Sequence, residues 1–111
     1  MSIASLNAEK KEIVRRAMAA TFDYFTFDFG DRIGIEPDEM RKLLDEWPNL
    51  DDSDDTSPSC VAINNSFNDL LYGEGISETE ALVKIGVDRR EVWRVYRKWA
   101  QARGSNHTGV R

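Results

Sequence analysis

Hydrophobic residues recur three and four positions apart along most of this chain, which is the spacing of a buried stripe on an α-helix. The first stripe predicts a helix that Asn7 or Ser5 can cap through a side-chain oxygen. Its hydrophobic face comprises Ile13, Val14, Ala17, Met18, Thr21 and Phe22. Phe25, Phe27 and Phe29 then alternate as in a strand, but the chain has no second convincing strand to pair with them. We therefore expect the helix to continue to about Phe27 or Phe29.

Two more helices are predicted after a turn over residues 30–34, which a glycine marks at each end. Pro37 suits the first position of one helix, because its missing N–H would be unpaired there in any case, and Pro48 ends that helix. Ser57 with Pro58 starts the other helix, which ends at Gly73. Asn64 and Asn65 stand in its middle, where Asn is unfavourable. If either is buried, it should pair with another element.

The segment between these two helices, residues 49–57, is an acidic loop by composition, with aspartates at positions 51, 52, 54 and 55. Carboxylates of this kind could bind a hard cation. The loop lacks the alternating acidic spacing, the central Gly and the closing Glu of an EF-hand loop. We therefore favour a solvated linker over a metal site.

The last third of the chain predicts two helices joined by a tight turn. Ser77 with Glu80 forms a capping box for the first, and Asp88 with Glu91 repeats the pattern for the second. Gly86 lies between them and can adopt the left-handed backbone that ends a helix. The whole chain is accordingly predicted to be all-α, a single domain over residues 1–111 with about five helices, in which residues 1–6 and 104–111 are flexible.

This pair of helices resembles the helix-turn-helix DNA-binding motif. The residues that carry the resemblance are Ile85, Gly86, Val87, Val92 and Val95. They match the family's last apolar residue of the first helix, its turn glycine, its turn apolar residue and two core positions of the recognition helix. The family usually has a small residue where the two helices approach closely. Aligned on Gly86, that position falls on Leu82, with Ala81 one place earlier.

Charge is distributed in agreement with this resemblance. At 100° per residue, Val92, Val95, Tyr96 and Trp99 share one side of the last helix, and the opposite side is basic. Residues 84–111 carry a net charge of +6, whereas the rest of the chain carries −11, although the total is only −5. Such asymmetry indicates a nucleic acid or an acidic protein as partner. The candidate binding residues are Arg89, Arg90, Trp93, Arg94, Arg97 and Lys98.

Two functional hypotheses follow. In the first, the chain is a small, non-enzymatic regulatory protein that binds double-stranded DNA through the helix-turn-helix, and a homodimer would be needed for a palindromic site. In the second, it is a protein interaction or scaffold module whose basic last helix docks on an acidic partner. An exposed Trp93 among arginines would suit such an interface.

The sequence gives little indication of disulfide, catalytic, metal-binding or membrane-spanning roles. A single Cys60 excludes a disulfide framework within the chain and suits a reducing cytoplasm, where we expect a buried structural thiol. His107 is the only histidine, so no histidine triad or histidine-rich metal site is available, and we predict no enzyme and no cofactor. No apolar run approaches the ~20 residues that span a bilayer, so we expect a soluble protein without a membrane partner.

Overall fold

In a computed structural model, the chain is described at residues 3, 6–24, 29–50, 52, 54, 56–73 and 75–102. These residues form helices and turns without any strand, so the all-α prediction is confirmed. The α-helices of this part are α1 (Ala8–Tyr24), α2 (Phe29–Ile33), α3 (Pro37–Asp45), α4 (Pro58–Asn68), α5 (Glu78–Glu80) and α6 (Arg89–Ala102). Two π-helical turns, η1 (Asp69–Gly73) and η2 (Ala81–Ile85), extend α4 and α5.

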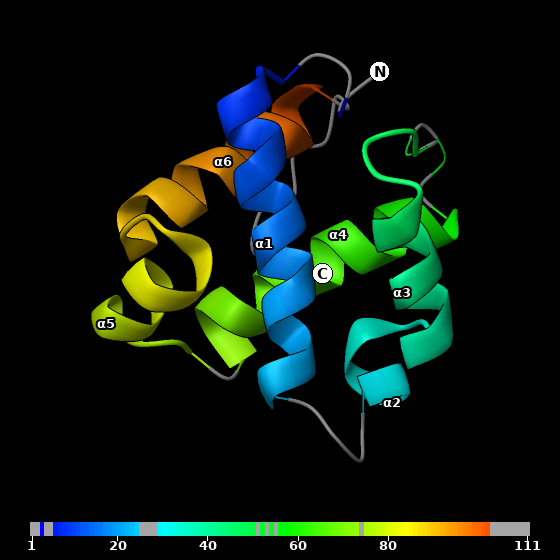
Figure 1. Cartoon of the computed structure of the whole chain (residues 1–111), viewed down its shortest axis with the longest axis horizontal. Coiled ribbons are helices and arrows are strands. Elements are labelled where there is room, and N and C mark those ends of the chain that lie inside the picture. The colour runs from blue at the N-terminus through cyan, green and yellow to red at the C-terminus, as the bar shows by residue number, and fades with distance from the viewer. Residues whose placement is uncertain are drawn as a thin grey trace.

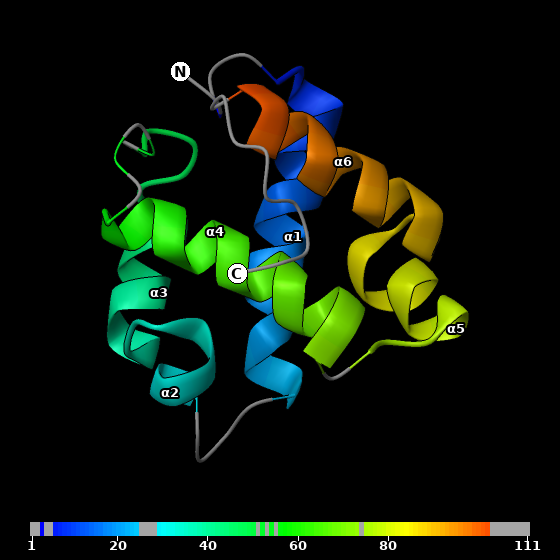
Figure 2. The same ribbon diagram turned by 180° about the vertical axis from the view of Figure 1, so that it is seen from behind.

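Helix α1 runs through the middle of the molecule and packs against α3, α4, η2 and α6 (Figure 1). Helices α2 and α3 lie on one side of it, and α5, η2 and α6 lie on the other. Helix α4 crosses behind α1, as the reverse view makes clear (Figure 2). The C-terminal helix pair therefore stands on a hydrophobic base made by α1 and α4.

Every element except α5 contributes to one hydrophobic core. Helix α1 buries the stripe predicted for it, with Val14, Ala17 and Met18 fully buried, and α4 adds Ile63 and Phe67. In α6 the buried side chains are Val92, Val95, Tyr96, Trp99 and Ala100. The periodicity in the sequence thus identified the inward faces of α1 and α6.

The predicted helix starts carry the expected caps. Asn7 Oδ1 accepts a hydrogen bond from the backbone N–H of Lys10 at 2.8 Å, and Ser57 Oγ accepts one from Cys60 at 3.2 Å. Ser77 and Glu80 form a complete capping box. The Ser77 backbone N–H and then the Tyr24 hydroxyl donate to the Glu80 carboxylate, and they hold its pKa below the usual range.

Asp88 and Glu91 form half of the capping box that the sequence predicts. Asp88 Oδ1 accepts a hydrogen bond from the Glu91 N–H at 2.8 Å. The Glu91 carboxylate lies 3.5 Å from Arg94, with which it forms an exposed ion pair. The start of α6 is therefore capped by one side chain.

The prediction of a turn over residues 30–34 is wrong, because residues 29–33 form the helix α2 and only Gly34 turns the chain. Phe29 and Ile33, spaced by one helical turn, are both buried, and that burial outweighs the poor helix propensity of the glycine between them. Gly34 has a φ of +90°, and a Cβ there would lie 2.7 Å from Val61 in α4. The first helix ends at Tyr24, and the predicted continuation over residues 25–28 lies outside the described residues.

The N-terminal segment contains two anchored residues. Ile3 and Leu6 are only 2% and 4% exposed, so the predicted flexibility of residues 1–6 does not hold at these two positions. The Ile3 backbone N–H donates to Asp52 Oδ2 at 3.2 Å. Hydrophobic burial and this hydrogen bond outweigh the usual fraying of a chain end. The predicted flexible tail over residues 104–111 lies outside the described residues.

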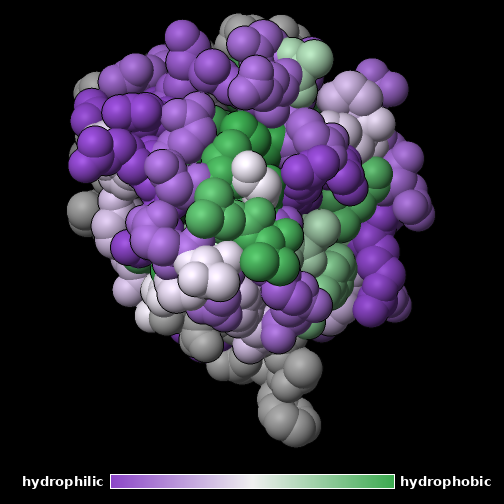
Figure 3. Space-filling view, turned by 60° about the vertical axis from the view of Figure 1, so that its left-hand side comes forward, coloured by the Kyte–Doolittle hydropathy of each residue, from purple (hydrophilic) through white to green (hydrophobic). Residues whose placement is uncertain are grey.

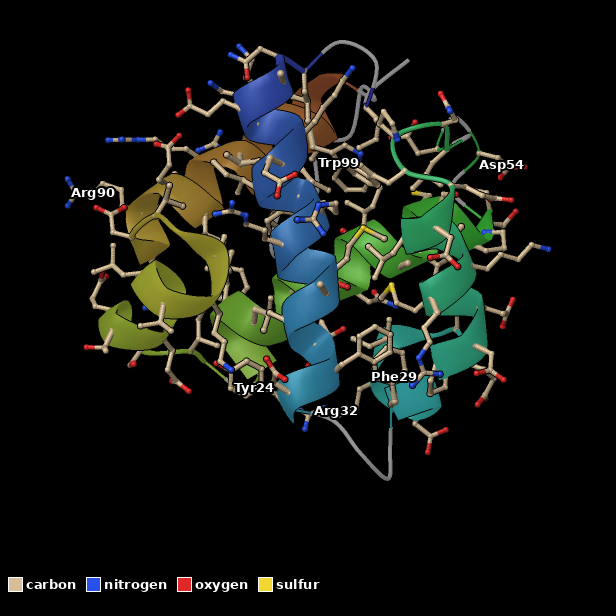
Figure 4. All side chains as sticks on the ribbon, viewed as in Figure 1. Tyr24, Phe29, Arg32, Asp54, Arg90 and Trp99 are labelled. Atoms are coloured by element: carbon tan, nitrogen blue, oxygen red, sulfur yellow. The ribbon has the colours of Figure 1, made fainter. Side chains whose placement is uncertain are left out.

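Asp52 overturns the interpretation of the acidic segment as a solvated linker. Its side chain is fully buried, and its Oδ2 accepts the Trp99 indole N–H at 2.7 Å as well as the Ile3 N–H. Buried carboxylates persist where hydrogen bonds replace the lost hydration. Asp52 therefore ties the N-terminal segment to the end of α6, whereas Asp54 on the same segment is exposed (Figure 4).

The two asparagines of α4 are paired with other elements, as expected for buried amides. Asn65 is 8% exposed, and its Nδ2 donates to the Ile33 carbonyl at 2.8 Å. Asn64 Oδ1 accepts the Tyr96 hydroxyl at 2.6 Å. These bonds fasten α4 to α2 on one side and to α6 on the other.

Gly86 is the position where a Cβ would be most costly in the C-terminal pair. Its φ of +93° is left-handed, and an added Cβ would lie 2.6 Å from Arg16 Nη1. We expect Gly86→Ala to lower the free energy of unfolding by about 1–2 kcal/mol. Urea denaturation followed by circular dichroism would measure this loss.

Gly75→Ala is the matched control, because Gly75 also has a positive φ, of +73°, but nothing lies within 4 Å of an added Cβ. Gly75→Ala should lose only the free energy of placing alanine in a left-handed backbone. Its free energy of unfolding should therefore fall by less than that of Gly86→Ala. A Gly86→Ala variant that is as stable as the wild type would contradict the assignment of this turn.

Candidate nucleic-acid interface

The candidate surface is built on α6, whose inner face fixes its orientation. Val92, Val95 and Trp99 are fully buried, and Tyr96 stacks between Phe67 and Trp99 at ring-centre distances of 5.3 and 6.2 Å. A helix held in this way cannot roll without exposing these side chains. Its outer face is therefore presented in one orientation.

The helix that precedes the Gly86 turn is not a plain α-helix, and this affects whether Ala81 or Leu82 is buried. The Gly86 N–H donates to the Ala81 carbonyl at 3.0 Å, five residues back, which is the bond of a π-helical turn. A π-turn accommodates one extra residue. Ala81 is fully buried as a result, and Leu82, which alignment on Gly86 places at the close approach, is 55% exposed.

Four of the six predicted binding side chains project from the outer face of α6. Arg90, Arg94, Arg97 and Lys98 are all exposed. Arg90 points away from the body of the molecule, whereas Trp99 on the same helix points inward (Figure 4). Within the described residues, Arg90 and Lys98 have no ion pair or hydrogen bond, and Arg94 has only the weak pair with Glu91 at 3.5 Å.

Arg89 is placed differently from the other cations. Its Nη2 donates to the Leu71 carbonyl of η1 at 2.8 Å, and its backbone N–H donates to Glu78 Oε2 at 3.4 Å. The side chain is half-buried, and its Nε has no hydrogen-bond partner among the described residues. Arg89 thus fastens the start of α6 to η1 and contributes one edge of the site.

Trp93 is held at the border of the basic face by two contacts. Its indole N–H donates to the Tyr72 hydroxyl at 2.7 Å, and the Arg97 guanidinium lies 4.9 Å from its ring centre. The indole is 36% exposed and Tyr72 is 53% exposed. Trp93 therefore lies at the edge of the basic face, with its indole fixed by Tyr72 and Arg97.

A cavity of about 630 Å³ lies beside Trp93, between η1, α5 and the first turns of α6. It is open to solvent and is lined by Leu71, Tyr72, Glu78, Arg89, Arg90, Trp93 and Arg94. Three of these lining residues, on η1 and α5, were not identified as site residues from the sequence. In the sequence, the glycines at 73 and 75 indicate only a flexible connection after this helix. No spacing of residues in the sequence indicates that the Tyr72 side chain contacts α6.

The face formed by α5, η2 and α6 also has a hydrophobic area that the sequence analysis did not predict. Leu82 and Val83 are 55% and 74% exposed, and Val87 is half-buried. Hydrophobic side chains gather near the middle of this face, with polar side chains around them (Figure 3). The π-turn turns Leu82 outward, so a helical stripe alone could not place it.

Other candidate chemistry is limited in the described part of the chain. Cys60 is buried, as expected of a structural thiol, and burial, with the Asp52 and Asp54 carboxylates, raises its pKa to about 11. No three His, Cys, Asp or Glu side chains come together there as a metal ion would require. None of the helices in the described ranges combines the length and hydrophobicity needed to cross a membrane.

Comparisons with known proteins add no assignment. No family model, curated protein or solved structure matches this chain. Function must therefore be inferred from the site itself.

Proposed function

We propose that this chain is a small regulatory protein of the cytoplasm that binds double-stranded DNA through the outer face of α6. The observation that carries the proposal is the set of uncompensated cations on that face. Arg90, Arg94 and Arg97 lie opposite the buried Val92, Val95 and Trp99, and the described residues offer them one weak ion pair and one aromatic contact. Exposed guanidinium groups in a row are able to bind a series of anions, and DNA phosphates supply a regular series of them.

The local architecture supports the same proposal. A short helix, a turn with Gly86 in the left-handed conformation and a longer helix with an exposed polar face form the arrangement expected of a helix-turn-helix. Ala81 is fully buried, and η2 packs against α6. In this proposal α6 enters the major groove, and Arg90 or Arg94 donates to guanine edges.

The remaining candidate residues take supporting roles. Arg97 and Lys98 lie further along α6 and contact phosphate, and Arg89 positions the start of the helix through the Leu71 carbonyl. Trp93 lies at the rim of the interface. A homodimer would let two copies of α6 read two half-sites one helical turn of DNA apart.

The proposal predicts duplex binding that depends steeply on salt. Fluorescence anisotropy with a labelled random duplex of about 20 base pairs should detect binding at low salt. If about four phosphates are neutralised, log affinity should fall with log salt with a slope of about −3 to −4. Absence of binding even at low salt would reject DNA as the partner.

A second candidate function is supported by the exposed hydrophobic side chains. Leu82 and Val83 lie on η2, beside the basic helix, and DNA backbone binding does not need them. Hydrophobic residues bordered by arginines are typical of protein interfaces. In this alternative the chain is an interaction or scaffold module, and α6 docks on an acidic protein. Loss of that partner, but not of DNA binding, on Val83→Ser would favour it.

A further inference from the structure

The cavity beside Trp93 is large enough to hold a small molecule. Its volume of about 630 Å³ lies within the range of about 300–1,000 Å³ that ligand pockets occupy. Its lining combines three arginines with two aromatic rings and one carboxylate. The proposed duplex contacts use Arg90 and Arg94 of this lining but do not use Tyr72 or Glu78.

Two of the cations that line the cavity are available to bind an anion. Arg90 has no partner among the described residues, and Arg94 has only the Glu91 carboxylate at 3.5 Å. Both are exposed and belong to the first turns of α6, where the helix dipole also favours negative charge. Guanidinium groups bind phosphate through paired hydrogen bonds. Arg90 and Arg94 together therefore suit a phosphate group.

The aromatic wall offers a surface for a planar group. Trp93 and Tyr72 line the cavity together, joined by the hydrogen bond of 2.7 Å between them. Arg97 lies 4.9 Å from the Trp93 ring centre but does not line the cavity. A nucleobase stacks well on such rings, because every base has a π-face.

Among the described residues of the lining, Glu78 is the one carboxylate, and part of its charge is already compensated. Its Oε2 accepts the Arg89 backbone N–H at 3.4 Å, so part of its charge is offset by the start of α6. Its other oxygen has no hydrogen bond to the described residues and can accept one from the amino group of a base. A base with an amino group is therefore favoured over one that presents a carbonyl.

From these observations we propose that the cavity between η1, α5 and α6 binds a nucleotide whose base carries an amino group. The base stacks on Trp93 and Tyr72, and the phosphate pairs with Arg90 and Arg94. The nucleotide can be free or can be an unpaired unit of a DNA strand, since both present the same base and phosphate. This site does not depend on duplex binding, because it rests on the cavity and its rings.

Binding of adenosine 5′-monophosphate to the full chain tests the proposal by calorimetry and by tryptophan fluorescence. We expect it to bind at least tenfold more tightly than adenosine or inorganic phosphate, each of which lacks one half of the ligand. Inosine 5′-monophosphate, which has a carbonyl in place of the amino group, should bind several-fold more weakly. Equal binding of the nucleotide and of either fragment would overturn the proposal, as would no binding at all. Equal binding of the two nucleotides would overturn the role of Glu78.

Substitutions of residues that line the cavity test whether the nucleotide binds there. Trp93→Leu and Arg90→Gln should each weaken nucleotide binding at least fivefold, whereas Trp93→Phe should retain calorimetric binding and lose the fluorescence change. Lys98→Gln is the matched control, because Lys98 lies on α6 but does not line the cavity. Binding that survives both Trp93→Leu and Arg90→Gln would place the nucleotide elsewhere and overturn the proposal.

Two further measurements distinguish a free nucleotide from a single DNA strand as the ligand, and nucleotide binding from duplex binding. A single-stranded adenine octamer that binds more than tenfold tighter than the mononucleotide would identify the strand as the source, and equal affinity would identify the free nucleotide. Lys98→Gln should lower duplex affinity without altering nucleotide binding, and Tyr72→Ala should do the reverse. Failure of the duplex assay alone would therefore leave the nucleotide site standing.

Discussion

Trp99→Ala should lower the free energy of unfolding by about 3–5 kcal/mol, the range for removing a large aromatic side chain from a core. The indole is fully buried and stacks on Tyr96 at 6.2 Å. Its N–H also donates to Asp52 Oδ2 at 2.7 Å. Alanine would leave a cavity between α6 and the rest of the core and remove one donor from a buried carboxylate. Both effects point to the upper part of the range.

Trp93→Ala is the control for this experiment, because the two tryptophans lie on the same helix and Trp93 is 36% exposed. It should cost about 1 kcal/mol or less, since most of what it loses is surface contact. Urea denaturation at constant pH, followed by circular dichroism, gives both values. A loss below about 1 kcal/mol for Trp99→Ala would mean that α6 is not held by its inner face.

The parts of the fold that the sequence predicted are those that depend on local rules. Helix starts need a side-chain oxygen at one position, so Asn7, Ser57 and Ser77 could be recognised as caps from their neighbours alone. Gly86 could be assigned to a turn because a left-handed residue is required between two helices there. The inner face of α6 follows from the spacing of Val92 and Trp99 in the same way.

The parts that were mispredicted depend on contacts across the chain. Asp52 has three aspartates near it in sequence, and nothing local distinguishes it from them. Its burial results from the donors of Ile3 and Trp99, which lie 49 and 47 residues away. Helix α2 contains a glycine and has weak propensity, so its formation depends on the burial of Phe29 and Ile33.

The candidate site likewise contains residues that local rules predicted and residues that they could not predict. The basic outer face of α6 was predicted as a set, because its residues share one helix and one period. Tyr72 and Leu71 could not be found, because they reach Arg89 and Trp93 through the π-turn of η1. A π-turn shifts the angular position of every later side chain, and no spacing rule in the sequence signals it.

Replacing Arg90, Arg94 and Arg97 together with Gln should abolish measurable duplex binding at physiological salt and leave the fold intact. The three side chains are exposed and make one ion pair within the described residues, so their removal has little effect on stability. Gln is a good helix former, so α6 should persist. At low salt the dependence of log affinity on log salt should become shallower by up to about one unit for each lost phosphate contact.

The matched control replaces Lys10, Lys11 and Lys42 with Gln, which lowers the net charge from −5 to −8 as the α6 variant does but leaves α6 unchanged. If net charge alone governed binding, the two triple variants would lose affinity equally, and the proposed interface would be wrong. We expect the control to keep most of its affinity, because contacts at the interface release counterions directly, whereas these three lysines lie outside α6. Circular dichroism of both variants would show whether the helices are retained. If the α6 variant binds duplex DNA with wild-type affinity, this face is not the DNA surface. If, in addition, the wild type captures a specific acidic protein and the variant does not, α6 is a protein-docking helix.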